Sequence, residues 1–332
     1  MPAVSAIAGA NIALVKYWGK RSVVGNLPAV GSLSITLAGL TTRTRVTPDD
    51  QLEADQLLLN GREDEKQRAR VSATLARVRA LGGGEALPFA RVDSHNDFPT
   101  GAGLASSASG FAALVFAAAH AYEAPADASQ LSALAREGSG SAARSIFGGF
   151  VEMARGVRED GSDAVATPLL EAADWPLEVV VAITASGEKD VGSTEGMNLT
   201  ADTSAYWSGW LSAQEQDLSE ARQAVLSRDF DKLAEVSELS CLKMHGLAMS
   251  ARPGLLYWNG ATVECIHRIR ELRRKQALAV FFTVDAGPQV KAVCAPAHVQ
   301  RVREALESVD GVQRVIHTPL GPGAHLVADE TP

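Results

Sequence analysis

One stretch of the sequence limits the fold more than any other. Residues 104–122 consist almost entirely of Ala, Ser, Gly, Leu, Val and Phe, without a stripe of polar side chains. This pattern predicts a helix that is buried on most sides, with small residues that let neighbouring backbone approach closely. Such a helix needs a large core around it. The chain has 332 residues, which at roughly 150 residues per domain is enough for about two domains.

The composition argues against two classes of protein. The chain carries 31 Lys and Arg residues against 39 Asp and Glu residues, a formal net charge of −8, so we expect no nucleic-acid partner. No apolar run approaches the ~18 residues that a membrane-spanning helix needs. The longest runs cover residues 111–119 and 277–284. We therefore expect no membrane partner either.

The N-terminus and the cysteines predict a cytoplasmic protein. The apolar N-terminal stretch has no basic region before it, because the first lysine is Lys16, and we infer no secretion signal. The cysteines are odd in number, widely spaced and in no paired motif: Cys241, Cys265 and Cys294. This usage indicates free thiols in a reducing compartment rather than a disulfide or zinc framework.

The first half of the chain predicts strands mixed with helices. Alternation or turn signals predict strands at residues 32–38, 41–47, 57–59 and 89–92, with an Asn60-Gly61 hairpin turn after the third. Helical spacing predicts an amphipathic helix over residues 71–81, which ends at three glycines. A further helical stretch covers residues 131–137.

The second half predicts a different order of elements. We expect strands at residues 177–184, 277–284, 290–294 and 312–318, and helices at 203–227, 231–250, 259–274 and 298–307. This order indicates a split βαβ, ferredoxin-like pattern with an inserted helical hairpin. The chain is therefore predicted to be an α+β protein with two domains, residues 1–175 and 176–332.

The segment 96–110 is the strongest local signal for a binding site. A proline, two glycines and two serines (Pro99, Gly101, Gly103, Ser106 and Ser107) lead directly into the predicted buried helix, so that free backbone N–H groups and hydroxyls converge at its N-terminus. This arrangement favours phosphate binding. The segment is not a Walker motif, because no Gly-Lys-Ser or Gly-Lys-Thr follows. The alternative is an ordinary loop with a helix cap.

A second glycine-serine segment, residues 138–143, precedes Arg144. It satisfies the dinucleotide-binding fingerprint formally, but it follows a helix rather than a strand, and we reject that interpretation. The planar guanidinium of Arg144 suits a bidentate grip on carboxylate or phosphate. The alternative is a surface arginine in a tight turn.

Two further features could carry chemistry. Residues 10–21 place three cations and two aromatic residues in an otherwise apolar segment, which could hold a polyanion or could be a solvated basic turn. Asp285 follows an apolar strand and precedes a Gly-Pro turn. It is either the cap of an Asx turn or a partly buried general base.

Taken together, these segments resemble the GHMP superfamily of small-molecule kinases, and within it the diphosphomevalonate decarboxylase family. The resemblance follows the family's order along nearly the whole chain. It rests on residues 10–21, 31–37, 98–110, 138–151, 192–197, 244–245 and 282–291. The segments 16–20, 138–145 and 283–288 are specific to the decarboxylase branch, whereas 98–110 alone would indicate only the superfamily.

The resemblance implies a fold and a reaction. The fold would have an N-terminal domain like ribosomal protein S5 domain 2 and a ferredoxin-like C-terminal domain, with the active site in the cleft between them. The reaction would be the ATP- and Mg²⁺-dependent conversion of mevalonate 5-diphosphate to isopentenyl diphosphate, ADP, phosphate and CO₂. The family is usually homodimeric, so the resemblance also implies a homodimer.

The resemblance also assigns roles to individual residues. Asp285 would be the base or orienter for the 3-hydroxyl group, with Arg144, Lys20 and Asn11 completing the catalytic set. The substrate pocket would use Lys20 and Arg144 together with Tyr17, Ser139, Gly140, Ser141, Ser193 and Thr194. ATP would contact Pro99, Gly101, Ala102, Gly103, Leu104, Ala105, Ser106, Ser107 and Lys189. Mg²⁺ would be held mainly by the ATP phosphates, with Ser106 or Ser107 as a further contact.

The sequence departs from the family pattern at two places near the predicted substrate pocket. Ser22 stands where an acidic residue often follows the basic pair, and Val30-Gly31-Ser32 replaces Asn-Ser-Ser. Relatives that decarboxylate mevalonate 5-phosphate, or that stop after 3-phosphorylation, share most of this framework and are the alternative function. A non-catalytic ligand sensor on the same fold is an alternative of another class.

Overall fold

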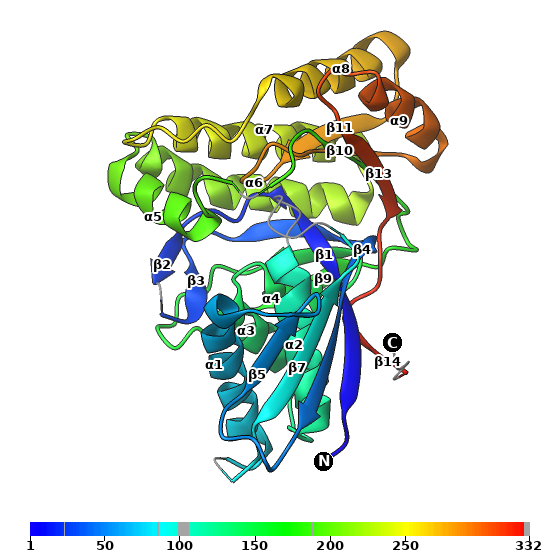
Figure 1. The fold of residues 1–332 in the computed structure, drawn as a ribbon. Helices are drawn as coiled ribbons and strands as arrows, with labels where there is room; N and C mark the ends of the chain where they lie inside the picture. Colours follow the sequence, from blue (N-terminus) through cyan, green and yellow to red (C-terminus); the bar gives the residue numbers. More distant parts are fainter. Residues whose placement is uncertain (23, 85, 99–105, 188, 329–332) are drawn as a thin grey trace.

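The structure, a computed structural model, describes residues 1–22, 24–84, 86–98, 106–187 and 189–328. Its strands form a larger sheet in the order β14-β1-β4-β7-β5-β6, a smaller sheet in the order β11-β12-β10-β13, and a two-stranded pair, β2-β3. Figure 1 shows the larger sheet with its helices in the lower half of the molecule and the smaller sheet with helices α6 to α9 in the upper half.

The larger sheet is built around two long strands, β1 (Val4–Val15) and β4 (Ser32–Pro48). Its other strands are β5 (Gln56–Leu59), β6 (Arg62–Glu63), β7 (Ala90–Asn96), β8 (Phe150–Met153), β9 (Ala166–Leu170) and β14 (His325–Val327). The predicted strands 32–38 and 41–47 are thus parts of one continuous strand, β4, whereas β1 was not predicted. Its nearly continuous apolar run lacks the alternation of a half-buried strand, because β1 is buried on both faces.

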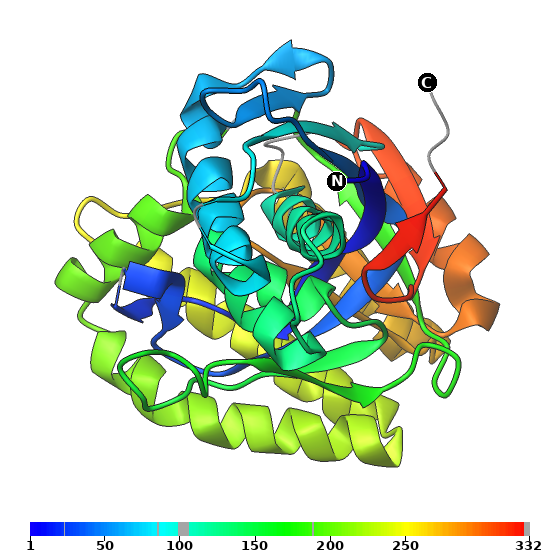
Figure 2. The same cartoon turned by 90° about the horizontal axis from the view of Figure 1, so that it is seen from below.

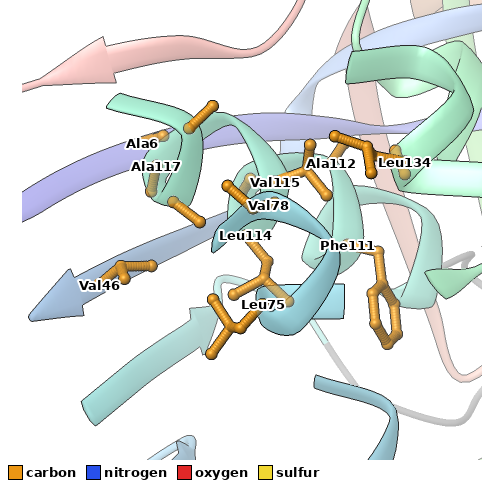
Figure 3. Close-up of a cluster of buried hydrophobic side chains, with 14 of the residues drawn as sticks. Ala6, Val46, Leu75, Val78, Phe111, Ala112, Leu114, Val115, Ala117 and Leu134 are labelled. Carbon is orange, nitrogen blue, oxygen red and sulfur yellow. The ribbon is translucent and has the colours of Figure 1, made fainter. Parts of the chain in front are cut away.

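Helix α2 (Ser106–Ala121) is the buried helix that the sequence predicts. It packs against one face of the larger sheet together with α1 (Glu65–Gly82) and α3 (Ala128–Gly138). Figure 2 shows α2 end-on near the centre of this domain, with α1 beside it. In Figure 3, Leu75 and Val78 of α1 lie against Leu114 and Val115 of α2, and Val46 of β4 closes the cluster.

The smaller sheet has the predicted ferredoxin-like order. It consists of β10 (Glu178–Ile183), β11 (Val280–Val284), β12 (Val290–Cys294) and β13 (Arg314–Pro319), all in antiparallel pairs. Helices α8 (Gly260–Gln276) and α9 (Val299–Glu307) cover one face. The other face shares a core with β1, β4 and the inserted hairpin of α6 (Trp207–Ser227) and α7 (Phe230–Met249). This shared core joins the two sheets.

Two predicted boundaries were wrong. The helix predicted over 203–227 begins only at Trp207, as α6, because Thr203 is the last residue of a separate helix, α5 (Ser193–Thr203), which ends at the extended residue Ser204 and which the sequence did not predict. The strand predicted from residue 277 begins at Val280, because α8 ends at a left-handed Ala277 cap. Asn259 caps α8 as predicted.

Short elements complete the chain: β2 (Lys20–Ser22), a 3₁₀ turn at Val24–Asn26, β3 (Leu27–Pro28), α4 (Ala142–Ser145) and a 3₁₀ turn at Pro296–His298. The cysteines are buried free thiols, as predicted. None of the helices in the described ranges is long and apolar enough to cross a membrane.

Candidate active site

A cavity of about 920 Å³ lies between the two halves of the molecule. Its wall includes the ends of β1 and β11 and the N-terminal ends of α2, α4 and α5. All predicted site residues that the structure describes line it: Asn11, Tyr17, Lys20, Ser106, Ser107, Ser139, Gly140, Ser141, Arg144, Lys189, Ser193, Thr194 and Asp285. The predicted ATP contacts Pro99, Gly101, Ala102, Gly103, Leu104 and Ala105 lie outside the described residues.

Asp285 lies between two lysines where strand β11 ends. Its Oδ1 is 2.6 Å from Lys16 Nζ, and its Oδ2 is 3.1 Å from Lys291 Nζ. Both lysine side chains are 1% exposed, whereas the Asp285 side chain is 26% exposed. The carboxylate is thus paired with two buried ammonium groups, and the interpretation of Asp285 as an ordinary Asx-turn residue is wrong.

The charges around Asp285 decide its protonation state. Burial alone would raise the pKa of its carboxyl, but the ammonium groups of Lys16 and Lys291 outweigh burial and lower the pKa well below its usual range. Asp285 is therefore ionised at every pH near neutrality. We call the three residues Lys16, Asp285 and Lys291 the reacting centre.

Arg144 lies fully buried beside the reacting centre. It is 1% exposed, which excludes the surface position considered from sequence. Its Nη1 donates to Ser32 Oγ at 2.8 Å, and its Nη2 and Nε donate to Asn11 Oδ1 at 3.1 and 3.3 Å. Burial lowers the pKa of Arg144 to about 10, despite the nearby Tyr17 and Asp285. The guanidinium is therefore a cation bound by neutral oxygens.

An irregularity in the pairing of β1 with β4 places Asn11 at the cavity. Ala6 and Ala8 face the core beneath α2, whereas Ala10 and Ile12 face the core shared with the smaller sheet. The strand register shifts between Gly9 and Asn11, so that the alternation of side chains changes sides there. Asn11 Nδ2 then donates to the backbone oxygen of Ser141 and to Ser145 Oγ, both at 2.8 Å.

Lys20 is a further cation that lines the cavity. Its Nζ donates to Asn26 Oδ1 at 2.7 Å and lies 3.4 Å from Thr194 Oγ1. Burial and the nearby Arg70 lower the pKa of Lys20. The side chain of Asn26 is anchored in turn, because its Nδ2 donates to the carbonyls of Arg136 and Glu137 in the last turn of α3. This basic segment is thus not a solvated turn.

Tyr17 and the glycine-serine segment form the wall beside Lys20. Burial raises the pKa of Tyr17 to about 12, so that its hydroxyl stays protonated. A Cβ atom at Gly140 would lie 2.1 Å from this hydroxyl, so only glycine fits there. Ser139 Oγ donates to Ser107 Oγ at 3.2 Å and lies 3.5 Å from Ser141 Oγ. Hydroxyls from three segments therefore share one wall.

The N-terminus of α5 supplies the opposite wall. Ser193 and Thr194 open the helix after the Gly192 cap. Lys189 Nζ donates to Ser193 Oγ at 2.7 Å and to the carbonyl of Ala286 at 2.9 Å. Burial lowers the pKa of Lys189 to about 8, with Asp285 opposing and Lys291 adding to this shift. Hydroxyls, a helix N-terminus and a cation suit an anionic ligand.

Three residues that hold this site together were not among those predicted from the sequence: Lys16, Lys291 and Asn26. A signal for the lysines was present, because Lys16 directly follows a long apolar run and Lys291 lies inside the predicted buried strand 290–294. A lysine in such a position is buried only when it is paired. Asn26 carried no comparable signal.

The site suits a magnesium ion that arrives with a nucleotide. Among the described residues there is no group of three or more His, Cys, Asp or Glu side chains that could hold a metal by themselves. The hydroxyls of Ser106 and Ser107 at the start of α2 offer oxygen ligands, and Mg²⁺ commonly binds through few protein ligands plus substrate phosphates.

The two-domain α+β fold, with this cavity between its halves, defines a GHMP-type protein. Two family models match the chain. The model described as "Diphosphomevalonate decarboxylase-like N-terminal domain" matches residues 8–166, and the model described as "Mevalonate 5-diphosphate decarboxylase C-terminal domain" matches residues 179–318. The diphosphomevalonate decarboxylase of Candida albicans is 36% identical over 97% of both chains. The human enzyme is 36% identical over 87% of this chain and 76% of its own. The chain belongs to the diphosphomevalonate decarboxylase family.

Solved structures agree with this assignment. Mevalonate diphosphate decarboxylase from Staphylococcus aureus has a TM-score of 0.90 and 35% identity, with 98% of both chains covered. The structure described as "MDDEF in complex with MVAPP, AMPPCP and Magnesium" has a TM-score of 0.88 and 38% identity over 98% of both chains.

Proposed function

We propose that this cavity carries out the ATP-dependent decarboxylation of mevalonate 5-diphosphate. The products are isopentenyl diphosphate, ADP, phosphate and CO₂, and the reaction belongs to the mevalonate pathway of isoprenoid biosynthesis. The observation that carries the proposal is the placement of a doubly paired carboxylate, Asp285, in one cavity with Arg144 and Lys20. The cavity thus offers one anionic group to a hydroxyl and separate cations to anions.

The order of the chemical steps follows from the substrate. A 3-hydroxy acid has no adjacent electron sink, so direct loss of CO₂ would leave an unstabilised carbanion. The 3-hydroxyl oxygen therefore first attacks the γ-phosphorus of ATP, and ADP leaves. The bond to the carboxylate carbon then breaks, its electron pair forms the carbon–carbon double bond, and phosphate leaves with the former hydroxyl oxygen.

Asp285 orients the 3-hydroxyl and accepts its proton. Because its pKa is low, the carboxylate is a weak base and cannot remove the proton before attack. Phosphoryl transfer passes through a loose transition state in which little proton removal is needed early, so that a well-placed weak base suffices. Lys16 and Lys291 hold the carboxylate in place and keep it ionised.

Arg144 and Asn11 hold the carboxylate side of the substrate. The guanidinium fork is fixed by Asn11 and Ser32, both neutral, and so it retains its charge for an anion. The diphosphate is assigned to the part of the cavity that is lined by a lysine, hydroxyl groups and a glycine: Lys20, Tyr17, Ser139, Gly140, Ser141, Ser193 and Thr194. This division puts the substrate's anionic ends on separate cations.

ATP is assigned to the side of the cavity at the N-terminus of α2. Ser106 and Ser107 line that side, and Lys189 lines the cavity from the wall of Ser193. The preceding residues Pro99, Gly101, Ala102, Gly103, Leu104 and Ala105 belong to the same proposed phosphate loop. Bound Mg²⁺ neutralises charge on the transferred phosphoryl group. Ser106 or Ser107 is its proposed protein contact.

The domain division and the assembly are also proposals. We assign residues 1–175 and 176–332 to two domains, a division that the smaller sheet supports because it starts at Glu178. The chain returns to the larger sheet at its end, where β14 pairs with β1. We further propose a cytoplasmic homodimer. Light scattering on the purified protein tests the dimer, and a monomer at micromolar concentration would contradict it.

The function is tested by measuring ADP and CO₂ together. Purified protein with Mg-ATP is given mevalonate, mevalonate 5-phosphate or mevalonate 5-diphosphate in parallel. Equal amounts of ADP and CO₂ from the diphosphate alone are expected. Preference for the monophosphate, ADP without CO₂, or ATP binding without turnover would indicate instead a 5-phosphate decarboxylase, a 3-kinase or a ligand sensor.

A further inference from the structure

Helix α7 contacts the backbone on both sides of the Lys16–Asp285 ion pair. Lys16 directly follows β1 of the larger sheet, and its backbone N–H donates to Ser240 Oγ at 3.0 Å. Asp285 directly follows Val284, the last residue of β11 in the smaller sheet. One helix therefore reaches the ends of two strands that belong to different sheets.

Val284 is held by two side chains of the same helix. Its N–H donates to Cys241 Sγ at 3.2 Å, and its carbonyl accepts from Cys241 Sγ at 3.5 Å and from His245 Nε2 at 3.2 Å. Cys241 and His245 are one helical turn apart and so lie on the same face of α7. The residue before Asp285 thus has both backbone polar groups fixed by α7.

His245 is suited to hold a carbonyl here without adding charge. It is 2% exposed and lies against the rings of Tyr257 and Trp258. Burial, reinforced by Lys16, lowers the pKa of His245 to about 3, so the imidazole is neutral. Because its partner is a carbonyl, Nε2 carries the proton. A charged donor would add a third cation beside one carboxylate.

We propose that Ser240, Cys241 and His245 form a positioning device, the α7 clamp, which sets the distance between Lys16 and Asp285 across the two sheets. None of the three is placed in contact with substrate. The inference rests on the proposed function for its kinetic effect, but the geometry that it concerns exists in the free protein. A misplacement of a catalytic group by about 1 Å can lower the rate about 10²-fold. Loss of one hydrogen bond of the clamp should move Asp285 or Lys16 less than this and should therefore lower the rate less.

The test compares variants that keep or remove the donor at His245. H245F keeps a ring without the donor, and H245Q keeps an N–H near the position of Nε2. S240A removes the hydroxyl that accepts the Lys16 N–H at the end of β1. The control is V236A, which truncates a buried side chain on the same helix, about one turn before Ser240 and more than two turns before His245. We measure kcat, both KM values and Tm for each protein.

We expect H245F and S240A to lower kcat about tenfold while both KM values stay within about twofold. H245Q should recover most of kcat, and V236A should lower Tm without lowering kcat. An unchanged kcat in H245F and S240A would overturn the clamp, and so would an H245Q variant as slow as H245F. If H245F does not fold, S240A still decides.

The two proposals fail differently. A wild-type protein that turns over none of the three substrates contradicts the proposed function. In that case kinetics cannot test the α7 clamp, and crystal structures are used instead. Crystal structures of wild type and H245F then decide it. A Lys16 Nζ to Asp285 Oδ1 distance of 2.6 Å in wild type that is clearly longer in H245F supports the clamp, and an unchanged distance overturns it.

Discussion

The two ends of the cavity treat their cations in opposite ways. At the reacting centre, the ammonium groups of Lys16 and Lys291 are paired with a carboxylate. At the other end, the ammonium of Lys20 is bound by the neutral oxygens of Asn26 and Thr194. Paired cations serve to fix and ionise Asp285, whereas a cation with neutral partners keeps its charge for a bound anion.

Arg144 resembles Lys20 in this respect, although it is far more buried. Both cations are held by amide and hydroxyl oxygens. The carboxylate proposed to be catalytic, with its two lysines, is thus distinct from the cations proposed to bind substrate. Changes at the first should lower kcat, and changes at the second should mainly weaken binding, which the following variants test.

The largest effect is expected at Asp285. Asp285→Asn removes the group that orients the 3-hydroxyl and accepts its proton, and kcat should fall by about 10²- to 10⁴-fold. ATP binding, measured by calorimetry, should stay within a few-fold. Asp217→Asn is the matched control, because Asp217 pairs with Lys243 at 2.8 Å outside the cavity. Near-normal turnover in Asp285→Asn would remove Asp285 from the mechanism.

Arg144→Lys should have the second-largest effect. A lysine cannot reproduce the fork that contacts Asn11 and Ser32 together, and we expect kcat/KM for the diphosphate to fall about 10²-fold. Arg79→Lys serves as control, because Arg79 makes a buried bidentate pair with Asp55 elsewhere. It should lower Tm and spare turnover. A mild kinetic effect of Arg144→Lys would demote Arg144 to a structural residue.

Lys20→Met tests the other end of the cavity, where the cation has neutral partners. Loss of this cation should raise KM for mevalonate 5-diphosphate by about tenfold, or about 1.4 kcal/mol, and change kcat much less. The effect should be smaller for mevalonate 5-phosphate, which carries less charge. Lys275→Met removes a cation on the exposed face of α8 and should change neither constant. An effect confined to kcat would place Lys20 at the reacting centre instead.

The smallest effect concerns Lys189 and pH. Its pKa is lowered to about 8, so its ammonium is charged below pH 8 and is lost as pH rises through that value. We expect kcat/KM for ATP to fall by about threefold to tenfold between pH 7 and 9. Lys189→Met should have a lower value at pH 7 and a flatter profile. An equally steep profile in Lys189→Met would assign the titration to another group.

Local sequence patterns were enough to predict most elements and the glycine-serine segments of the cavity, whereas other cavity residues, such as Asn11 and Ser193, were assigned through the family resemblance. The helix N-terminus at Ser106 and the loop before Arg144 each combine their signals within a few residues. The missed strand β1 and the missed helix α5 show where such patterns fail. A strand buried on both faces loses its alternation, and a short helix of mixed residues has weak periodicity.

By itself, the sequence determined the α+β class, the buried helix α2, the ferredoxin-like order and the positions of most polar side chains that line the cavity. The class, the helix and the order of elements follow from periodicity, small residues and turn residues, which act over short stretches of chain. Many of the cavity side chains were assigned through the resemblance to the family. Only the tertiary structure decided the state of those side chains. Lys16 and Asp285 are 269 residues apart in sequence, and their pairing, their burial and the pKa of the carboxyl depend on two sheets packed against one helix. Electrostatic interactions act through space, and no local pattern records them.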